Sequence, residues 1–330
     1  MKQLKPFLGD IDTMLTTMGE GGNPYVQPAL KNLGVVNLVL VRELIAPASF
    51  RNGDAEVTDI EYKGKVHVRA VANKFKYGER SEGLRVLRAL NAGGKLPQNR
   101  TAFGDKDAPG DFYDLNTIVF GDSAMKGKRP LASKAGMTYS DAISVGEYTD
   151  SVDKTFHNRA GEEGTLFDPV KKEASVNLFD RHFVKPGTLL VQVITLNGRT
   201  VPQEAIDHLL LSIRTSGAYG GQTSVYGVNT RNHLVGAYAD LFETPSASPY
   251  VLVEAIRRAG VEPTDLDGVK AELARLCAAE HQVSVAGELI TAHQRDLMTR
   301  LRDADPELRD RYAASAAAVS AFYNGWFEKV

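Results

Sequence analysis

Three segments rich in apolar residues predict the centre of a β-sheet. Residues 34–45 and 188–196 are dense in β-branched and aliphatic side chains, which is typical of strands that are buried on both faces. Residues 226–238 alternate between apolar and polar positions and predict a third strand. A shorter apolar run at 114–121 is predicted as a further strand.

The other periodic segments predict a hairpin and two helices. Residues 57–71 alternate, and the Lys63-Gly64 pair in their middle indicates a tight hairpin turn. Apolar residues recur at helical spacing over 79–91, which ends at a pair of glycines, and over 202–215.

The order of these elements predicts an α+β fold with a ferredoxin-like core, the arrangement shared with RNA-recognition domains. In chain order they read β-α-β-β-α-β, namely strand 34–45, helix 79–91, strand 114–121, strand 188–196, helix 202–215 and strand 226–238. We therefore expect residues 1–121 to hold the first half of the core, with a finger-like hairpin insertion at about 52–78. Residues 188–245 hold its second half with a glycine-rich loop.

Two regions lie outside this pattern. Residues 122–187 are polar, with weak hydrophobic periodicity, and such a long stretch predicts a thumb-like insertion that projects from the core. Residues 246–330 are rich in alanine, and apolar faces at 251–259, 266–283 and 285–301, with a last helix from Pro306, predict a helical extension.

Composition narrows the function. The chain has 330 residues, 39 basic and 41 acidic, so a globally basic nucleic-acid binder is excluded while a local basic groove is not. The single cysteine, Cys277, excludes an internal disulfide and a thiolate metal cluster, and the scattered histidines predict no metal site. Neither a secretory leader nor a membrane-spanning run is visible, so we expect a cytoplasmic protein.

A glycine-rich loop between helix 202–215 and strand 226–238 is the main candidate site. Glycine allows positive φ and lets a backbone come close to a ligand, and exposed N–H groups and hydroxyls between Arg214 and Arg231 suit a phosphate backbone. A simple turn is the alternative. The nucleotide-cofactor fingerprints are absent, so no cofactor is expected.

Basic residues near strand ends add further candidates. Arg51 follows the first strand in a polar turn, where it could contact a phosphate or be a solvated surface arginine. Lys74 and Lys76 alternate with aromatic residues, a combination that can neutralise phosphates and stack bases, although an exposed strand end explains it equally well.

No catalytic constellation emerges. The acid pairs Asp10/Asp12 and Asp54/Asp59 could supply metal ligands, but such pairs are common on solvated surfaces. His208 lies near the apolar face of its helix and is interpreted as structural. The sequence therefore predicts a binding protein and no enzyme.

Several motifs together resemble one family. The run AYGGQTSVYG at 218–227, followed by RNH at 231–233, is similar to the glycine loop of the backbone subunit of the type I-D CRISPR interference complex, a member of the seventh Cas family in the RAMP superfamily. Further similar motifs, in the family's order, are LIAP at 44–47, FGDS at 120–123, TFHN at 155–158 and KPGT at 185–188.

The resemblance implies an RNA-binding role. Such a subunit polymerises along the CRISPR RNA, grips its sugar–phosphate backbone without cutting it, and supports recognition of target DNA or RNA beside the cap, large and small subunits of Cascade, away from any membrane. Besides Arg51, Lys74 and Lys76, the implied RNA-binding residues are Arg214, Gly217, Tyr219, Gly220, Gly221, Gln222, Thr223, Ser224, Arg231, Asn232 and His233.

In related subunits a thumb from one copy flips a base of the guide–target duplex, and the implied candidates here are Phe156, His157 and Asn158. Two alternatives stay open. One is a metal-dependent ribonuclease of the same superfold that cuts target RNA through Asp54, and the other is a general RNA-recognition module.

Overall fold

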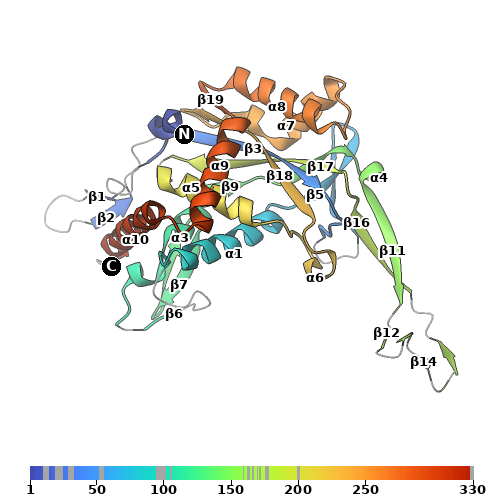
Figure 1. Cartoon of the computed structure of the whole chain (residues 1–330), viewed down its shortest axis with the longest axis horizontal. Helices are drawn as coiled ribbons and strands as arrows, with labels where there is room; N and C mark the ends of the chain where they lie inside the picture. The colour runs from blue at the N-terminus through green and yellow to red at the C-terminus, as the bar shows by residue number, and fades with distance from the viewer. Residues whose placement is uncertain are drawn as a thin grey trace.

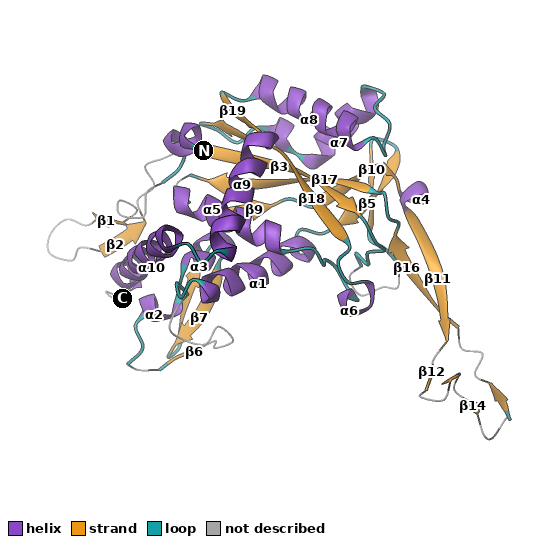
Figure 2. Cartoon of the chain, viewed as in Figure 1, coloured by secondary structure: helices purple, strands orange, loops and turns teal. Residues whose placement is uncertain are grey.

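An antiparallel sheet with helices on both faces forms the centre of the molecule (Figures 1 and 2). The computed structural model describes residues 1–9, 15–18, 25–28, 33–51, 56–93, 102–104, 106–158, 160–161, 164–165, 167–168, 170, 172–174, 178–198 and 201–327. The strand order is β19 (Val283–Ala286), β18 (Thr230–Asp240), β3 (Val35–Leu44), β17 (Leu189–Asn197), β10 (Ala142–Glu147), β5 (Lys65–Ala70) and β4 (Asp59–Tyr62), and β9 (Met137–Tyr139) also pairs with β17. Every pairing in this sheet is antiparallel.

The central strand β3 is buried on both faces, as its high content of β-branched and aliphatic residues predicts. Val36, Leu38 and Leu40 pack into the core cluster beneath helices α1 (Asn73–Ala89) and α5 (Gln203–Thr215). Val39 and Val41, one position out of step, pack on the opposite face against α7 (Pro249–Arg258) and α8 (Leu266–Glu280). This is the two-residue period of a strand with a core on each side.

The hairpin predicted around Lys63-Gly64 is confirmed. Both residues have positive φ, 52° and 76°, which is the geometry of the two-residue turn whose twist matches its strands. The turn joins β4 to β5, and β5 pairs with β10 at the sheet edge. The hairpin therefore extends the central sheet.

Two predictions about the first half of the chain are wrong. Residues 114–121 are not a strand: α3 (Leu115–Phe120) is a helix whose start is fixed by a capping box between Asp114 and Thr117. All six of its residues are buried, so its sequence lacks the polar face that separates a helix from a strand. Lys74 and Lys76 do not lie on a hairpin, because α1 begins at Asn73 and not at 79.

Two strands of the central sheet, β9 and β10, lie inside the segment expected to form a thumb and were not predicted. In β10, residues 142–145 are buried, and the strand pairs with β17 on one side and β5 on the other. It is short and holds only two branched aliphatic residues, Ile143 and Val145, which leaves little periodicity to detect. The core order is thus β18-β3-β17-β10.

A long two-stranded ribbon projects from one end of the sheet (Figure 1). It pairs β11 (Val152–Asn158) with β16 (Leu178–Val184) over their whole length, and we call these two strands the arm. Val184 and Ala48 exchange backbone hydrogen bonds at its base. Short strands follow at its tip, namely β12 (Ala160–Gly161), β13 (Gly164–Thr165), β14 (Phe167–Asp168) and β15 (Glu173–Ala174).

The helical extension is confirmed, with one strand added. It consists of α7, α8, α9 (Gly287–Arg302) and α10 (Pro306–Phe327), while β19 between α8 and α9 pairs with β18. Gly287 lies directly against β18, where a Cβ would overlap the Leu234 carbonyl oxygen. Within the described chain, no helix has the length and apolar character that crossing a bilayer requires.

The remaining elements are small and surround this core. They are a 3-10 helix (Lys2–Phe7), β1 (Leu15–Met18), β2 (Tyr25–Pro28), β6 (Ala102–Phe103), α2 (Pro109–Phe112), β7 (Asp122–Lys126), β8 (Arg129–Ser133), α4 (Tyr148–Ser151), α6 (Thr223–Tyr226) and a 3-10 helix (Pro245–Ala247).

His208 is a structural residue in α5 and gives the fold a predicted pH dependence. Its ring is fully buried, Nε2 lies 3.0 Å from Asn116 Oδ1, and burial lowers its pKa to about 3. The unfolded chain binds a proton near pH 6.5 that the folded chain does not bind. Below about pH 6.5 the free energy of unfolding should therefore fall, by at most ~1.4 kcal/mol per pH unit.

Urea denaturation of wild type and His208→Gln between pH 7 and about pH 4.5 measures this contribution. The variant should be less stable at pH 7 and should lose less stability on acidification. If the free energy of unfolding fell equally with pH in both proteins, His208 would not be the source of the pH dependence.

Candidate nucleic-acid interface

A buried ion pair lies beneath the glycine-rich loop. Arg42 of β3 and Glu79 of α1 are both fully buried, and Arg42 Nη1 donates to Glu79 Oε1 at 2.7 Å. The guanidinium also donates to Gln192 Oε1 of β17, from Nε at 3.0 Å and from Nη2 at 2.7 Å. The pair thereby links two neighbouring strands to the helix that covers them.

The same network reaches the loop through Tyr219. Its hydroxyl donates to Glu79 at 3.0 Å, and its ring packs on Phe75 with 5.0 Å between ring centres. Asn232 accepts from Arg42 Nη1 at 2.8 Å and donates to the Tyr219 hydroxyl at 3.1 Å. Tyr219 is only 1% exposed, so it holds the loop from within and its side chain is not available as the RNA contact that we predicted.

The surroundings of Arg42 favour its protonated form. Burial, the largest single influence, lowers the pKa of Arg42, but Glu79, Tyr219 and Tyr139 together outweigh it, and the pKa is raised above its usual value. Burial and the Glu79 charge both raise the pKa of Tyr139, whose hydroxyl donates to Glu79 Oε2 at 2.6 Å. The loop therefore rests on a buried ion pair that is held by several hydrogen bonds.

Backbone contacts hold the loop in one conformation. The Asn229 side chain donates to Tyr219 O and accepts from Tyr219 N, at 2.8 and 3.0 Å. Gly221 N donates to Ser49 O at 2.8 Å. Gly220 has φ +85°, and a Cβ there would lie 2.5 Å from Ser49 O. Glycine at 220 is therefore required both by the backbone angle and by the approach to the end of the first strand.

Two arginines meet the loop at Gln222. With the Gln222 amide turned so that its oxygen faces them, this oxygen accepts from Arg51 Nη2 and from Arg181 Nη1, each at 3.3 Å. Arg51 follows β3 and Arg181 lies on the arm strand β16. Among the described residues neither guanidinium has a carboxylate partner, so the pair can accept an anion.

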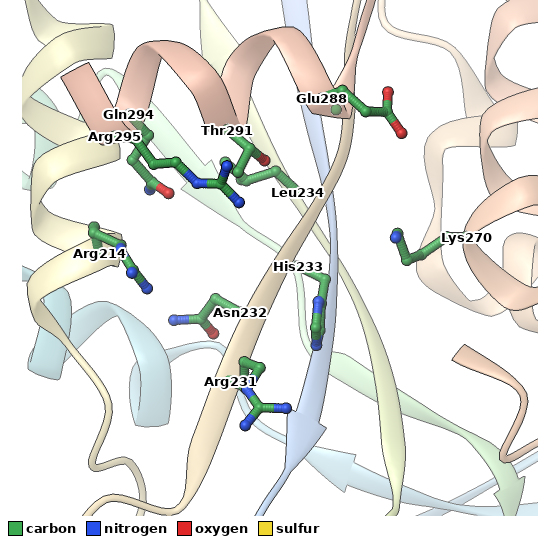
Figure 3. A pocket seen from close by; sticks show the side chains of 11 residues that line it. Arg214, Arg231, Asn232, His233, Leu234, Lys270, Glu288, Thr291, Gln294 and Arg295 are labelled. Carbon is green, nitrogen blue, oxygen red and sulfur yellow. The ribbon is translucent and has the colours of Figure 1, made fainter. Parts of the chain in front are cut away.

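A basic groove runs from the loop toward the C-terminal helices. It consists of two adjoining hollows of about 330 and 430 Å³ that share Arg214, Arg231, Asn232 and Gln294. The smaller one also holds Gly217 and Val228. In the larger one, Figure 3 shows side chains from α5, β18, α8 and α9 around a common space.

Most of the groove's charge is positive and accessible. The Arg231 side chain is 60% exposed while it donates to Glu43 at 3.2 Å, and Glu43 also contacts His233 at 2.8 Å. Arg214 and Arg295 are exposed, and neither has a carboxylate partner among the residues that the structure describes. Such a surface can bind phosphates without reading base identity.

The structure brings many of the predicted residues together. Arg214, Gly217, Arg231, Asn232 and His233 line the basic groove. Gly220, Gly221 and Gln222 lie beside Ser49 and Arg51, and Thr223 and Ser224 follow in the single turn α6. The α1 residue Phe75 packs against the Tyr219 ring with 5.0 Å between ring centres, which places the start of α1, with Lys74 and Lys76, beside the loop.

Other predicted residues lie elsewhere or cannot be described. Phe156 is on the arm, 60% exposed, with Lys154 Nζ 5.4 Å from its ring centre. His157 and Asn158 belong to the same strand, β11. Asp54 and the pair Asp10/Asp12 lie outside the described residues. Among the residues that are described, no three His, Cys, Asp or Glu side chains gather closely enough to hold a metal ion.

Sequence reasoning missed the cations contributed by other parts of the chain. Arg181 comes from the arm, Lys270 from α8 and Arg295 from α9. The sequence indicates only weakly that Arg295 could bind RNA, because an arginine on the polar face of an amphipathic helix is common. Only the fold shows that this helix begins against β18.

A family comparison assigns the chain. The model described as "Csc2 Crispr" matches residues 110–317, which include β10, the arm, the glycine-rich loop and most of the residues that line the basic groove. The chain belongs to the Csc2 CRISPR family. No curated protein matches it.

One solved structure agrees with this Csc2 assignment at the level of the fold. The crystal structure of Thermofilum pendens Csc2 has a TM-score of 0.62 and 15% sequence identity, and the match covers 100% of this chain and 96% of that one. Chains from "CRISPR RNA-guided surveillance complex, pre-nicking" and "CRISPR RNA-guided surveillance complex" have TM-scores of 0.44 and 0.41 at 12% and 13% identity. Each of these matches covers 74% of this chain and 99% of the other.

Proposed function

We propose that this Csc2-family chain is the CRISPR RNA-binding backbone subunit of a type I-D Cascade complex. Several copies line up along the guide, and each holds a short segment by its sugar–phosphate backbone. The observation that carries the proposal is the convergence of Arg214, Gly217 and Arg231, from three different elements, on one accessible basic groove.

The proposal includes the core fold, the partners and the lack of catalysis. The order β18-β3-β17-β10, with α1 and α5 as crossovers, supports a ferredoxin-like core.

The proposed partners are the guide, the target strand paired to it, further copies of the chain and the other Cascade subunits. The proposed location is the cytoplasm. The arm, with exposed Phe156, is the thumb that reaches a neighbour, and the chain itself does not cut RNA.

The chemistry of the groove fits a guide of any sequence. Its polar lining includes three guanidiniums, the Lys270 ammonium and several hydroxyls, which can bind phosphate and ribose equally well in every nucleotide. A net charge of -2 is compatible with this role, since only the groove must be basic and many copies add their contacts along one strand.

The test is binding of two single-stranded RNAs of equal length and unrelated sequence at several salt concentrations. Wild type should bind both alike. Arg214→Ala/Arg231→Ala removes two phosphate contacts, so the slope of log K against log salt should fall by about 1.4, and affinity at 0.1 M salt by about 25-fold.

The matched control is Arg275→Ala, which removes an exposed arginine that pairs with Glu272 on α8 outside the groove. It should bind RNA like wild type. If wild type fails to bind RNA at low salt, or if the double variant and the control behave alike, the proposed function is wrong.

A further inference from the structure

We propose that the larger hollow of the basic groove, between β18 and the C-terminal helices, is a subsite that holds one nucleotide of the bound RNA by its phosphate. This inference rests on the proposed function and extends it to residues of the helical extension. Arg295 and Lys270 then become RNA-binding residues.

The size and shape of the hollow fit such an occupant. Its volume of about 430 Å³ is in the range of small-ligand pockets and exceeds the space that one phosphate alone requires. It opens into the smaller hollow at Arg214 and Arg231, and Gly217 of the glycine-rich loop lines that second space. A strand that follows the loop can therefore continue into the hollow.

The charges point to a phosphate. Arg214, Arg231, Lys270 and Arg295 come from four different elements, and Figure 3 shows the guanidiniums of Arg214 and Arg295 directed into the same space. Lys270 contacts only Asp267 among the described carboxylates, at 3.4 Å, and the Asp267 side chain is 92% exposed. Exposed guanidiniums that share one hollow, two of which (Arg214 and Arg295) have no carboxylate partner among the described residues, suit a multidentate anion such as phosphate.

One acidic residue, Glu288, also lines the hollow, at the start of α9. Figure 3 shows its carboxylate at the edge of the space, away from Arg214. It lowers the positive potential of the subsite without filling it. Removal of this charge should therefore strengthen phosphate binding, which gives the proposal a variant with the opposite sign.

The helix that carries Arg295 is fixed in place before RNA binds. Gly287 lets the start of α9 lie against Leu234. Gln294, next to Arg295, donates to the Leu210 carbonyl of α5 at 2.8 Å. His293 contacts Asp207 of α5 at 2.7 Å. The backbone of Arg295 is therefore held in place by the packing of α9 against β18 and α5, which reduces the entropy lost on binding.

The first experiment measures RNA affinity and its salt dependence for Arg295→Ala/Lys270→Ala, Glu288→Gln and the control Arg275→Ala. The RNA affinity of the double variant at 0.1 M salt should fall by about fivefold or more. The slope of log K against log salt should fall by about 0.7 for each phosphate contact that is lost. Glu288→Gln should bind about two- to fivefold more tightly, and the control should match wild type.

A second experiment locates the RNA. Cys277 is the only cysteine and is 2% exposed, and burial raises the pKa of its thiol to about 12, so it resists labelling. A cleavage reagent attached to Thr291→Cys, in the hollow, should cut bound RNA at defined positions. The same reagent on Ser284→Cys of β19, outside this hollow, should give weaker cuts.

The outcomes separate this inference from the proposed function. If wild type binds RNA but Arg295→Ala/Lys270→Ala has the same affinity and salt dependence as wild type, the subsite is wrong and the backbone-binding role stands. The same holds if wild type binds RNA but the reagent at position 291 does not cut it. An absence of RNA binding by wild type overturns both. Three results together support the subsite. They are a lower salt slope for Arg295→Ala/Lys270→Ala, tighter RNA binding by Glu288→Gln and RNA cleavage from position 291.

Discussion

Glu79→Gln should lower the free energy of unfolding by about 3–5 kcal/mol, the usual cost of leaving a buried charge without its partner. The substitution keeps the size and most hydrogen-bonding groups of the side chain, so the loss comes from the charge. Arg42 would then be a fully buried cation whose remaining partners, Gln192 and Asn232, are neutral. Urea denaturation followed by circular dichroism measures this loss.

Glu82→Gln is the matched control on the same helix. Its partner Arg85 has a side chain that is 72% exposed, so the ion pair is solvated and the change should cost less than ~1 kcal/mol. A double variant, Arg42→Met/Glu79→Gln, should be destabilised by less than the sum of its single changes, because the two charges interact. If Glu79→Gln cost no more than Glu82→Gln, the buried pair would not be the base of the loop.

Gly220→Ala should cost about 2–4 kcal/mol of stability and reduce RNA affinity at least tenfold. Position 220 has φ +85°, which is unfavourable for alanine, and the new Cβ would lie 2.5 Å from the Ser49 carbonyl oxygen. The loop must move away from the end of β3 to relieve this contact. That movement also displaces Gln222 from Arg51 and Arg181.

Gly221→Ala is the control, one residue further along the same loop. Its φ is not in the left-handed region, and a Cβ would meet Ser49 O at 3.7 Å, an ordinary van der Waals distance. It should therefore change stability by less than ~1 kcal/mol. Equal stabilities for the two alanine variants would mean that the approach to Ser49 does not fix the loop.

The parts of the fold with strong local patterns were predictable from the sequence. Strand 34–45 is rich in apolar residues because both of its faces are buried, and helix 202–215 has a clear apolar face. Residues 114–121 were not predictable, since a fully buried helix has the same apolar run as a buried strand. Strand β10 was missed because its two branched residues give no measurable alternation.

The candidate site was predictable in part for a similar reason. Glycines, hydroxyls and flanking arginines are local signals, and Arg214, Gly217 and Arg231 lie together as expected. Tyr219 and Asn232 look like surface residues in the sequence, yet they hydrogen-bond to a buried ion pair whose members are far apart in the chain. Arg181 and Arg295 reach the same region only through the fold.

In the proposed function, RNA lies along the basic groove beside the glycine-rich loop. Cross-linking of 4-thiouridine-substituted RNA to the full chain, followed by identification of the linked peptides, tests this directly. Cross-links should fall within 214–233, with further ones in α9, and should be the same for RNAs of unrelated sequence. If cross-links were confined to other surfaces and residues 214–233 were unmodified, RNA would not lie along the basic groove.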